Sequence, residues 1–380
     1  MRQISWASIS GRRAARQGLG NDLYDGPPAD LARAMCGVHA QVMSAAELSI
    51  GLRLDGATRE SVRDALWTER ELVKTIGPRG TVHLFATADL PLWTGALSAM
   101  PRGRSPFPAD VAMDEDQTAA VVDAIGTALR DGELTVDELG EAVVDLAGAW
   151  AGDLVMPAFQ GFWPRWRQAI GTAAYAGALC FGPDRGRKVA YTSPSRWSRG
   201  FTPAKPKEAV PEVIRGYLRA YGPATADDFA RWLGAPAGWV AEWFGKLDLE
   251  RVRVASHGEA WQLPGEPTSA KPEGVRLLPY FDAYVVAGRP RELLFPGRAA
   301  DRALARGQAG NYPALLVDGD VAGVWHLRRS GRRSVVTVEP IARLNAVRQQ
   351  ALAEQVDRIG AFFGGPAELV VDKVTVGPHA

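Results

Sequence analysis

Cysteine is scarce in this chain and long apolar runs are missing, and both absences narrow the possible classes of protein. The 380 residues include two cysteines, Cys36 and Cys180, each in apolar surroundings. Two cysteines cannot form a disulfide framework, so a reducing cytoplasm is expected. The segment from Met1 to Trp6 lacks the apolar core of a signal peptide, and no run is long enough to cross a bilayer. We therefore expect a cytoplasmic protein with no membrane partner.

The signatures of the common enzyme classes are also missing. The chain has no phosphate-binding loop, no dinucleotide fingerprint, no His-Glu-x-x-His pair and no Gly-x-Ser-x-Gly nucleophile turn. Cys36 and His39 have the spacing of half a zinc site, but no second pair at ligand spacing accompanies them. We therefore expect neither a metal nor an organic cofactor.

Charge is balanced in total but unevenly distributed. The formal net charge is +1, from 44 Lys and Arg against 43 Asp and Glu. Acidic residues concentrate between Asp110 and Glu138, whereas basic residues concentrate between Arg185 and Arg199. Phosphate neutralisation depends on clustered positive charge rather than on its total, so nucleic acid remains a possible partner.

A short turn motif occurs twice and indicates a repeated helical module. In each copy a Gly permits a tight turn, a Thr caps a helix, and an acidic residue three positions later closes a capping box. The two copies are Gly132, Thr135, Asp137, Glu138, Leu139 and Gly222, Thr225, Asp227, Asp228, Phe229. A helix on each side of the turn and a following strand-turn-strand are typical of a winged helix. A weaker third copy starts at Gly26.

These patterns predict an α+β fold with three tandem winged-helix modules followed by a small C-terminal β-barrel. The predicted modules cover residues 1–100, 109–202 and 207–265, and the barrel covers residues 270–380. In the first module, strands at 72–76 and 81–85 flank a Gly- and Pro-bearing turn, in the position of a wing. Short runs rich in Val and Leu, one of them at 284–286, predict strands that fit a small barrel or a curled sheet.

A basic hairpin is predicted inside the barrel. Arg328 and Arg329 precede a Ser-Gly turn and Arg332 and Arg333 follow it, with no acidic residue between Val321 and Val338. From charge alone, such a cluster is as readily a solvated tip without a function as it is a binding site. In a chain otherwise near neutrality, the cluster favours contact with phosphates or with the minor groove.

One polar pair, His39 and Gln41, could form a catalytic site. Residues two apart in an extended backbone point to the same side, so the imidazole and the amide could share one water molecule. A His and a Gln in a loop are more often solvated polar groups. Spacing alone leaves both interpretations open.

Four segments along most of the chain follow the order found in one known family. They are His39 to Ala45, Arg79 to Leu84, Tyr221 to Thr225 and Leu277 to Asp282. In these segments the chain resembles the bacterial winged-helix DNA glycosylases of the AlkZ and YcaQ type, which remove alkylated bases and unhook interstrand crosslinks. The resemblance implies three winged helices and a β-barrel that clamp duplex DNA, with a barrel hairpin entering the groove. It also implies that His39 and Gln41 occupy the catalytic motif, which is Gln-apolar-Gln or Gln-apolar-Asp in those relatives.

The chain departs from that pattern at His39, which replaces the first Gln. This resembles a His-apolar-Gln branch that includes glycosylases acting in self-resistance to bulky DNA-alkylating natural products. An imidazole with a pKa of ~6.5 accepts a proton from water at neutral pH, which an amide cannot, while Gln41 orients the same water. A second departure is the segment Ala287 to Arg291, where relatives carry a more polar sequence.

The favoured interpretation is a monofunctional DNA glycosylase for cationic N7-alkylguanines, in which His39 and Gln41 act on water. Such an enzyme is expected to work as a monomer on double-stranded DNA, associated with the nucleoid. The expected DNA contacts are Arg79, Arg185, Arg187, Lys188, Arg328, Arg329, Arg332 and Arg333. The alternatives are a non-catalytic winged-helix DNA-binding protein or transcriptional regulator, and a protein-interaction scaffold.

Overall fold

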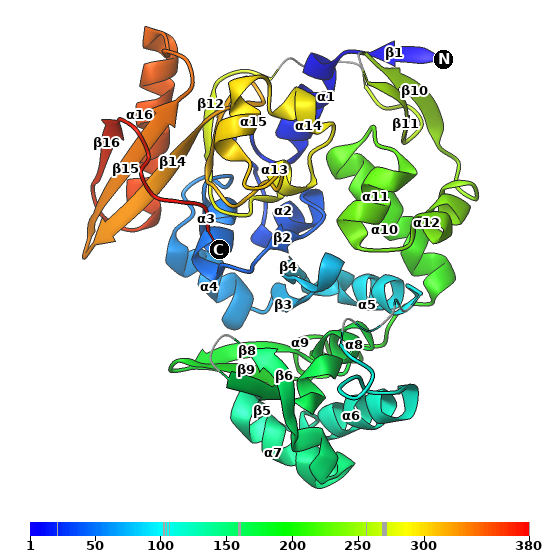
Figure 1. The fold of residues 1–380 in the computed structure, drawn as a ribbon. Coiled ribbons are helices and arrows are strands. Elements are labelled where there is room, and N and C mark those ends of the chain that lie inside the picture. Colours follow the sequence, from blue (N-terminus) through cyan, green and yellow to red (C-terminus); the bar gives the residue numbers. More distant parts are fainter. Residues whose placement is uncertain are drawn as a thin grey trace.

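The computed structural model describes residues 1–20, 22–101, 103, 105, 107–158, 161–255, 257–267 and 272–379. The fold is mixed α+β, with three helical units that each carry a small sheet, and a C-terminal region built on a larger sheet (Figure 1). No helix in these ranges is long and apolar enough to cross a membrane.

The first unit combines five α-helices with a three-stranded sheet of order β2-β4-β3. Its elements are α1 (Trp6–Arg16), α2 (Pro28–Ala34), β2 (Val38–His39), α3 (Met43–Gly51), α4 (Arg59–Trp67), β3 (Leu72–Ile76), η1 (Pro78–Gly80), β4 (Val82–Ala86), η2 (Thr87–Asp89) and α5 (Leu90–Ser98). The strands expected at 72–76 and 81–85 are confirmed as β3 and β4, which pair antiparallel.

The second unit has its own hydrophobic core around Trp166 and a sheet of order β5-β9-β8. Its elements are α6 (Glu115–Ala128), β5 (Glu133–Thr135), α7 (Val136–Ala147), η3 (Ala149–Gly152), β6 (Leu154–Ala158), β7 (Gly161–Pro164), η4 (Arg165–Ala169), α8 (Ile170–Tyr175), β8 (Cys180–Arg185), β9 (Lys188–Thr192) and α9 (Pro194–Trp197). It lies at the bottom of Figure 1, below α5.

The sheet of the third unit includes a strand from the start of the chain. Its own elements are α10 (Pro206–Tyr221), α11 (Ala226–Leu233), α12 (Ala237–Phe244), β10 (Glu250–Val254) and β11 (Gly258–Gln262). Strand β1 (Arg2–Ile4) pairs parallel with β10, so the sheet has the order β1-β10-β11. The N-terminus therefore lies beside the third unit, as Figure 1 shows.

The repeated turn forms the predicted capping boxes in both copies. The Thr135 and Thr225 hydroxyls each accept a hydrogen bond from a backbone N–H three residues later, at Glu138 and Asp228. Each carboxylate in turn accepts from the backbone N–H of its Thr. The local sequence thus determines where α7 and α11 begin.

The C-terminal region contains an open sheet rather than the expected closed barrel. Its elements are β12 (Val275–Leu278), α13 (Ala283–Ala287), α14 (Arg291–Leu294), α15 (Arg298–Ala303), β13 (Ala314–Val317), β14 (Asp320–Ser330), β15 (Arg333–Pro340), α16 (Ala346–Phe362) and β16 (Ala367–Val371). The five strands follow chain order, and no pairing between the outer strands β12 and β16 occurs in the described ranges.

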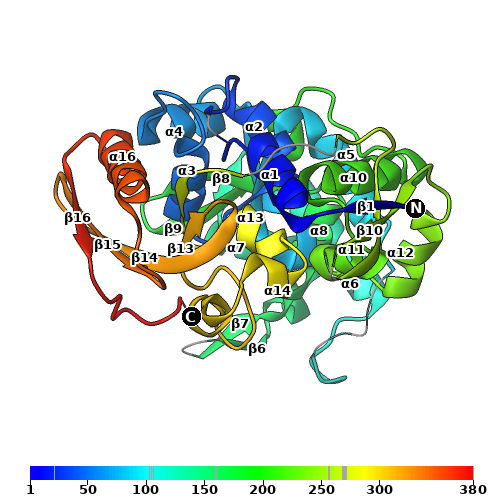
Figure 2. The same ribbon diagram turned by 90° about the horizontal axis from the view of Figure 1, so that it is seen from above.

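Helix α16 explains why the sheet does not close. It packs against β12 at one edge and β16 at the other, and it also contacts α3, so it lies between the sheet and the first unit (Figure 2). Gly51 at the end of α3 permits this approach, because a Cβ there would lie 2.2 Å from the ring of Phe362. A helix that fills the concave face leaves no room for the outer strands to meet.

The prediction of a strand at residues 284–286 is wrong, since these residues belong to helix α13. The Asp282 carboxylate begins this helix by accepting a hydrogen bond from the backbone N–H of Tyr284. A run of apolar residues this short does not distinguish a buried helical turn from a strand.

A buried ion pair joins the first unit to the C-terminal region. The guanidinium of Arg53, just after α3, donates to both carboxylate oxygens of Asp282 at 2.8 Å, and both side chains are fully buried. The Ser49 hydroxyl donates to the same carboxylate at 2.6 Å. Since every oxygen of the carboxylate has a donor, the pair holds the two segments in one relative position.

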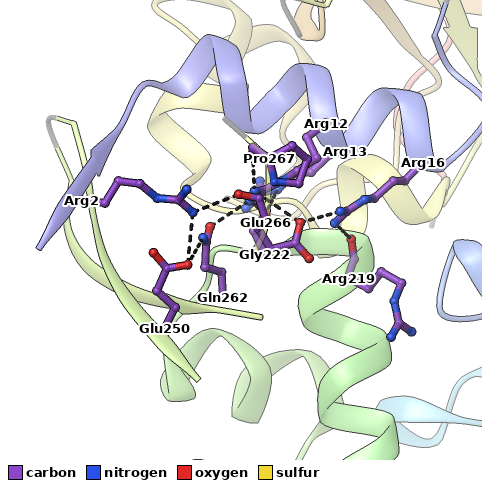
Figure 3. Close-up of polar contacts among 10 residues, drawn as sticks. All are labelled: Arg2, Arg12, Arg13, Arg16, Arg219, Gly222, Glu250, Gln262, Glu266 and Pro267. Carbon is purple, nitrogen blue, oxygen red and sulfur yellow. Dashed lines mark hydrogen bonds and ion pairs between the residues drawn. The ribbon is translucent and has the colours of Figure 1, made fainter. Parts of the chain in front are cut away.

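A second polar cluster joins α1 to the third unit (Figure 3). The buried guanidinium of Arg12 donates to the backbone carbonyl of Gly222 and to the side chain of Gln262. The carboxylate of Glu266 pairs with both Arg12 and Arg16. Helix α1 is thus attached to the third unit by charge-assisted hydrogen bonds rather than by apolar packing alone.

Removing one partner of the Arg53–Asp282 pair should destabilise the protein strongly. Changing Asp282 to Ala leaves a buried, unpaired guanidinium, so we expect the free energy of unfolding to fall by about 3–5 kcal/mol. Urea unfolding followed by tryptophan fluorescence measures this change. Asp137→Ala is the matched control, since Asp137 is exposed and pairs with Lys188 at 2.8 Å, and its effect should stay within about 1 kcal/mol. Equal effects of the two substitutions would contradict the role given to Asp282.

Candidate active site

His39 lies on β2, a two-residue strand at the edge of the first sheet. It stands directly opposite His83 of β4, and the next backbone N–H, of Ala40, donates to the Val82 carbonyl at 2.7 Å. Gly37 precedes the strand with φ 97°, and a Cβ there would lie 2.5 Å from the ring of Phe85. The backbone can therefore approach the core closely at this point, which holds β2 against β4.

The His39 side chain is enclosed by two rings. It is 8% exposed. Its imidazole stacks on Phe281, from the loop after β12, with ring centroids 5.2 Å apart and planes inclined by 29°. On another side the ring of His83 meets it edge-on at 5.1 Å and 68°. The Nδ1 atom is buried without a hydrogen-bond partner in the described structure, so Nε2 is the nitrogen left for a substrate or a water.

Burial makes His39 a weak base. It lowers the pKa of His39 from 6.5 to about 4, and the positive charge of Arg79 acts in the same direction. Desolvation penalises the imidazolium ion, and a neighbouring cation repels it. The imidazole is therefore neutral at physiological pH and able to accept a proton.

His83 is a second neutral imidazole beside it. Its Nδ1–H donates to the Thr81 carbonyl at 2.9 Å, because a carbonyl oxygen can only accept. Burial lowers the pKa of His83 well below its ordinary value, and the proximity of His39 adds to this effect. His83 is not among the site residues predicted from the sequence, although its place in the segment Arg79 to Leu84 was a usable signal.

Gln41 lies at the solvent-exposed end of the same edge. Its Oε1 accepts a hydrogen bond from the backbone N–H of Val82 at 3.3 Å, which leaves the amide NH2 group to donate elsewhere. No hydrogen bond joins His39 to Gln41 among the described residues. The structure places the two side chains next to one strand, one buried and neutral, the other exposed and polar.

The basic hairpin is a regular antiparallel pair. Arg328 and Arg329 lie just before Ser330, the last residue of β14, and Arg333 begins β15. Gly331 and Arg332 form the turn, one position beyond the expected Ser-Gly turn. The guanidinium of Arg329 lies 4.0 Å from the ring centroid of Phe363. A cation held on a ring face keeps its charge and is available to an anion.

The other expected DNA contacts differ in their surroundings. Arg79, in η1, donates to the backbone carbonyl of Trp232 and so joins the first unit to the third. Arg185 pairs with Glu138, and Lys188 pairs with Asp137 at 2.8 Å. Arg187 is exposed and has no ion pair within the described ranges. Of these four, only Arg79 influences His39 electrostatically.

The two candidate metal ligands of the sequence are not arranged as a site. Cys36 is buried, and burial raises the pKa of its thiol. A thiol that stays protonated is a poor metal ligand. In the ranges that the structure describes, no three His, Cys, Asp or Glu side chains are grouped to hold a metal ion.

Comparisons with known proteins agree on one family. The family model described as "DNA glycosylase AlkZ-like" matches residues 32–362. The chain is 30% identical over 355 residues to a protein of Streptomyces sahachiroi named "Interstrand DNA cross-link repair glycosylase", an alignment that covers 86% of this chain and 88% of the relative. The solved structure of Streptomyces sahachiroi DNA glycosylase AlkZ matches with a TM-score of 0.81 and 27% identity, over 97% of this chain and 100% of that chain. The chain belongs to the AlkZ-like DNA glycosylase family.

Proposed function

We propose that this DNA glycosylase hydrolyses the N-glycosidic bond of cationic N7-alkylguanines, including bulky or crosslinked adducts, with His39 and Gln41 acting on the attacking water. The observation that carries the proposal is the buried, neutral imidazole of His39 beside the exposed amide of Gln41. The relative named for interstrand crosslink repair supports crosslinked adducts as substrates. The biological role is repair, or self-resistance to a DNA-alkylating natural product.

A weak base suits this substrate class. Alkylation at N7 gives the purine a positive charge, so the glycosidic bond breaks towards an oxocarbenium-like sugar without an acid to protonate the base. The enzyme then needs only to place a water and accept its proton. In the part of the chain that the structure describes, His39 has no carboxylate partner at Nδ1, which fits a step that requires little basicity. Neutral lesions such as uracil are poor leaving groups under these conditions.

The proposed DNA contacts fall into two groups. One group consists of cations without an ion pair in the described ranges, and the other of cations that already pair with a carboxylate. Three tandem winged-helix modules, at residues 1–100, 109–202 and 207–265, would lie along the duplex. The hairpin cations from Arg328 to Arg333 have no acidic partner within the described ranges. Arg185 and Lys188 already pair with Glu138 and Asp137, so a phosphate would have to displace those carboxylates. The β14–β15 hairpin and the β8–β9 hairpin, to which Arg185 and Lys188 belong, both extend to the left in Figure 1.

The first test removes the catalytic pair. Changing His39 or Gln41 to Ala should lower the single-turnover rate of N7-methylguanine release by ~10²–10⁴-fold, because each side chain acts on water in the transition state. DNA affinity should change by less than about twofold, since neither group binds the ground state. His257→Ala, at an exposed histidine paired with Glu292, is the control and should keep full activity. A His39, Gln41 double Ala variant with the wild-type rate would remove this assignment.

The second test concerns pH. If His39 is the base, activity requires its neutral form, and a pKa of about 4 keeps that form dominant throughout the range from about pH 5.5 to 8. The single-turnover rate, corrected for enzyme-free depurination, should therefore be nearly constant over that range. Activity should fall only as the pH approaches 4. A rate that halves near pH 6.5 would mean that the base has an ordinary imidazole pKa and is not the buried His39.

The third test concerns the basic hairpin. Changing Arg328, Arg329, Arg332 and Arg333 together to Gln should weaken DNA binding and reduce its salt slope by up to about one logarithmic unit per lost phosphate contact. The Arg185, Lys188 double Gln variant should have a smaller effect, because each of these cations is already paired with a carboxylate. Fluorescence anisotropy at several salt concentrations measures both quantities. An unchanged affinity and slope in the hairpin variant would identify its tip as a solvated turn.

A further inference from the structure

The imidazole of His39 is oriented by packing instead of by a hydrogen bond. In most catalytic histidines the nitrogen that does not react donates to a carboxylate or a carbonyl, which selects the tautomer and fixes the ring. Here Nδ1 is buried and has no such partner in the described structure. The torsion that turns an imidazole about its Cβ–Cγ bond is soft. Something else must therefore hold the ring with Nε2 directed outwards.

We propose that Phe281 is the positioning residue of the glycosylase reaction, stacking on His39 so that Nε2 is held towards the substrate water. The inference rests on the proposed role of His39. Phe281 lies against the face of the imidazole at 5.2 Å and 29°, whereas His83 makes a T-shaped contact with it at 5.1 Å. A ring packed between two such neighbours cannot rotate without displacing one of them.

Phe281 is itself held firmly from the C-terminal region. Its φ is 55°, in the left-handed region, and its backbone N–H donates to the Gly310 carbonyl at 2.8 Å. A Cβ on Gly310 would lie 3.0 Å from the Phe281 Cα, so only a glycine lets this loop approach so closely. The residue that follows is Asp282, which the buried pair with Arg53 fixes to the first unit. The outer side of the Phe281 ring meets His379 at 5.4 Å and 75°.

The stacking of Phe281 on His39 also keeps water away from the face of the imidazole that it covers. Among the described residues, the titratable and charged groups against His39 and Phe281 are Arg79 on η1, His83 on β4, and Tyr280 and His379, which both contact the Phe281 ring. Each of them is cationic or neutral, so none stabilises an imidazolium ion. Opening the Phe281 side to water would therefore relieve the desolvation that disfavours the protonated form.

The experiment uses full-length protein with Phe281 changed to Ala, Leu or Tyr. We expect Phe281→Ala to lower the single-turnover rate of N7-methylguanine release by about 10- to 100-fold, because a misoriented base loses its alignment with the water. DNA affinity should remain within about twofold. Phe281→Tyr keeps the stacked ring and should restore the rate, while Phe281→Leu fills the space without a flat face and should restore it only in part. Phe162→Ala, at an exposed phenylalanine of β7, is the matched control.

A second readout follows the histidine directly. NMR titration of protein labelled with ¹³C at histidine Cε1, with the His39 signal assigned from a His39→Ala sample, gives the pKa of His39 without any assay of activity. In Phe281→Ala this pKa should rise towards ~6.5, and in Phe281→Tyr it should stay as in the wild type. A side chain that served stability alone would lower the melting temperature without this shift.

The outcomes separate the two proposals. A Phe281→Ala protein with the wild-type rate and an unchanged pKa of His39 would overturn the positioning role, while an inactive His39→Ala variant would still support the proposed function. A fully active His39→Ala variant would refute the proposed function and, with it, any catalytic role of Phe281. If Phe281→Ala does not fold, the comparison of Leu with Tyr decides, because equal rates and equal His39 pKa values in those two variants would refute the need for a stacked ring.

Discussion

The bidentate pair between Arg53 and Asp282 is the contact on which the candidate site depends most. It is fully buried and joins the end of α3 to the loop after β12. By fixing Asp282 it also fixes the preceding residue, Phe281, whose ring lies on the imidazole of His39. The first unit supplies the candidate catalytic histidine, and the C-terminal region supplies the surface against which it packs. The two parts of the chain therefore form one site.

The electrostatic character of this site follows from the same packing. His39 and His83 are both buried, both have lowered pKa values, and neither has a carboxylate partner among the described residues. Such a pair would be a poor choice for a reaction that requires strong acid or base catalysis. It suits a bond that is already activated by a cationic leaving group, since a neutral nitrogen that accepts a proton from water is then sufficient.

The basic residues of the two hairpins differ in whether an acidic residue pairs with them. The wing of the second unit carries Arg185 and Lys188, and α7 supplies Glu138 and Asp137 to pair with them. The arginines of the β14–β15 hairpin form no ion pair with an acidic residue in the described structure. A chain that is nearly neutral in total can therefore still carry a local concentration of positive charge.

The sequence by itself determined the features that depend on neighbouring residues. The capping boxes at Thr135 and Thr225, the hairpin at Arg328 to Arg333 and the family resemblance around His39 all rest on short spacings, because turns, caps and strand pairs are made by residues a few positions apart. Tertiary structure decided the rest. The open sheet, the strand β1 on the third unit, the stacking of Phe281 on His39 and the low pKa of that histidine depend on segments up to hundreds of residues apart. Packing and desolvation between such segments leave no local pattern in the chain, so they become visible only once the fold has brought the segments together.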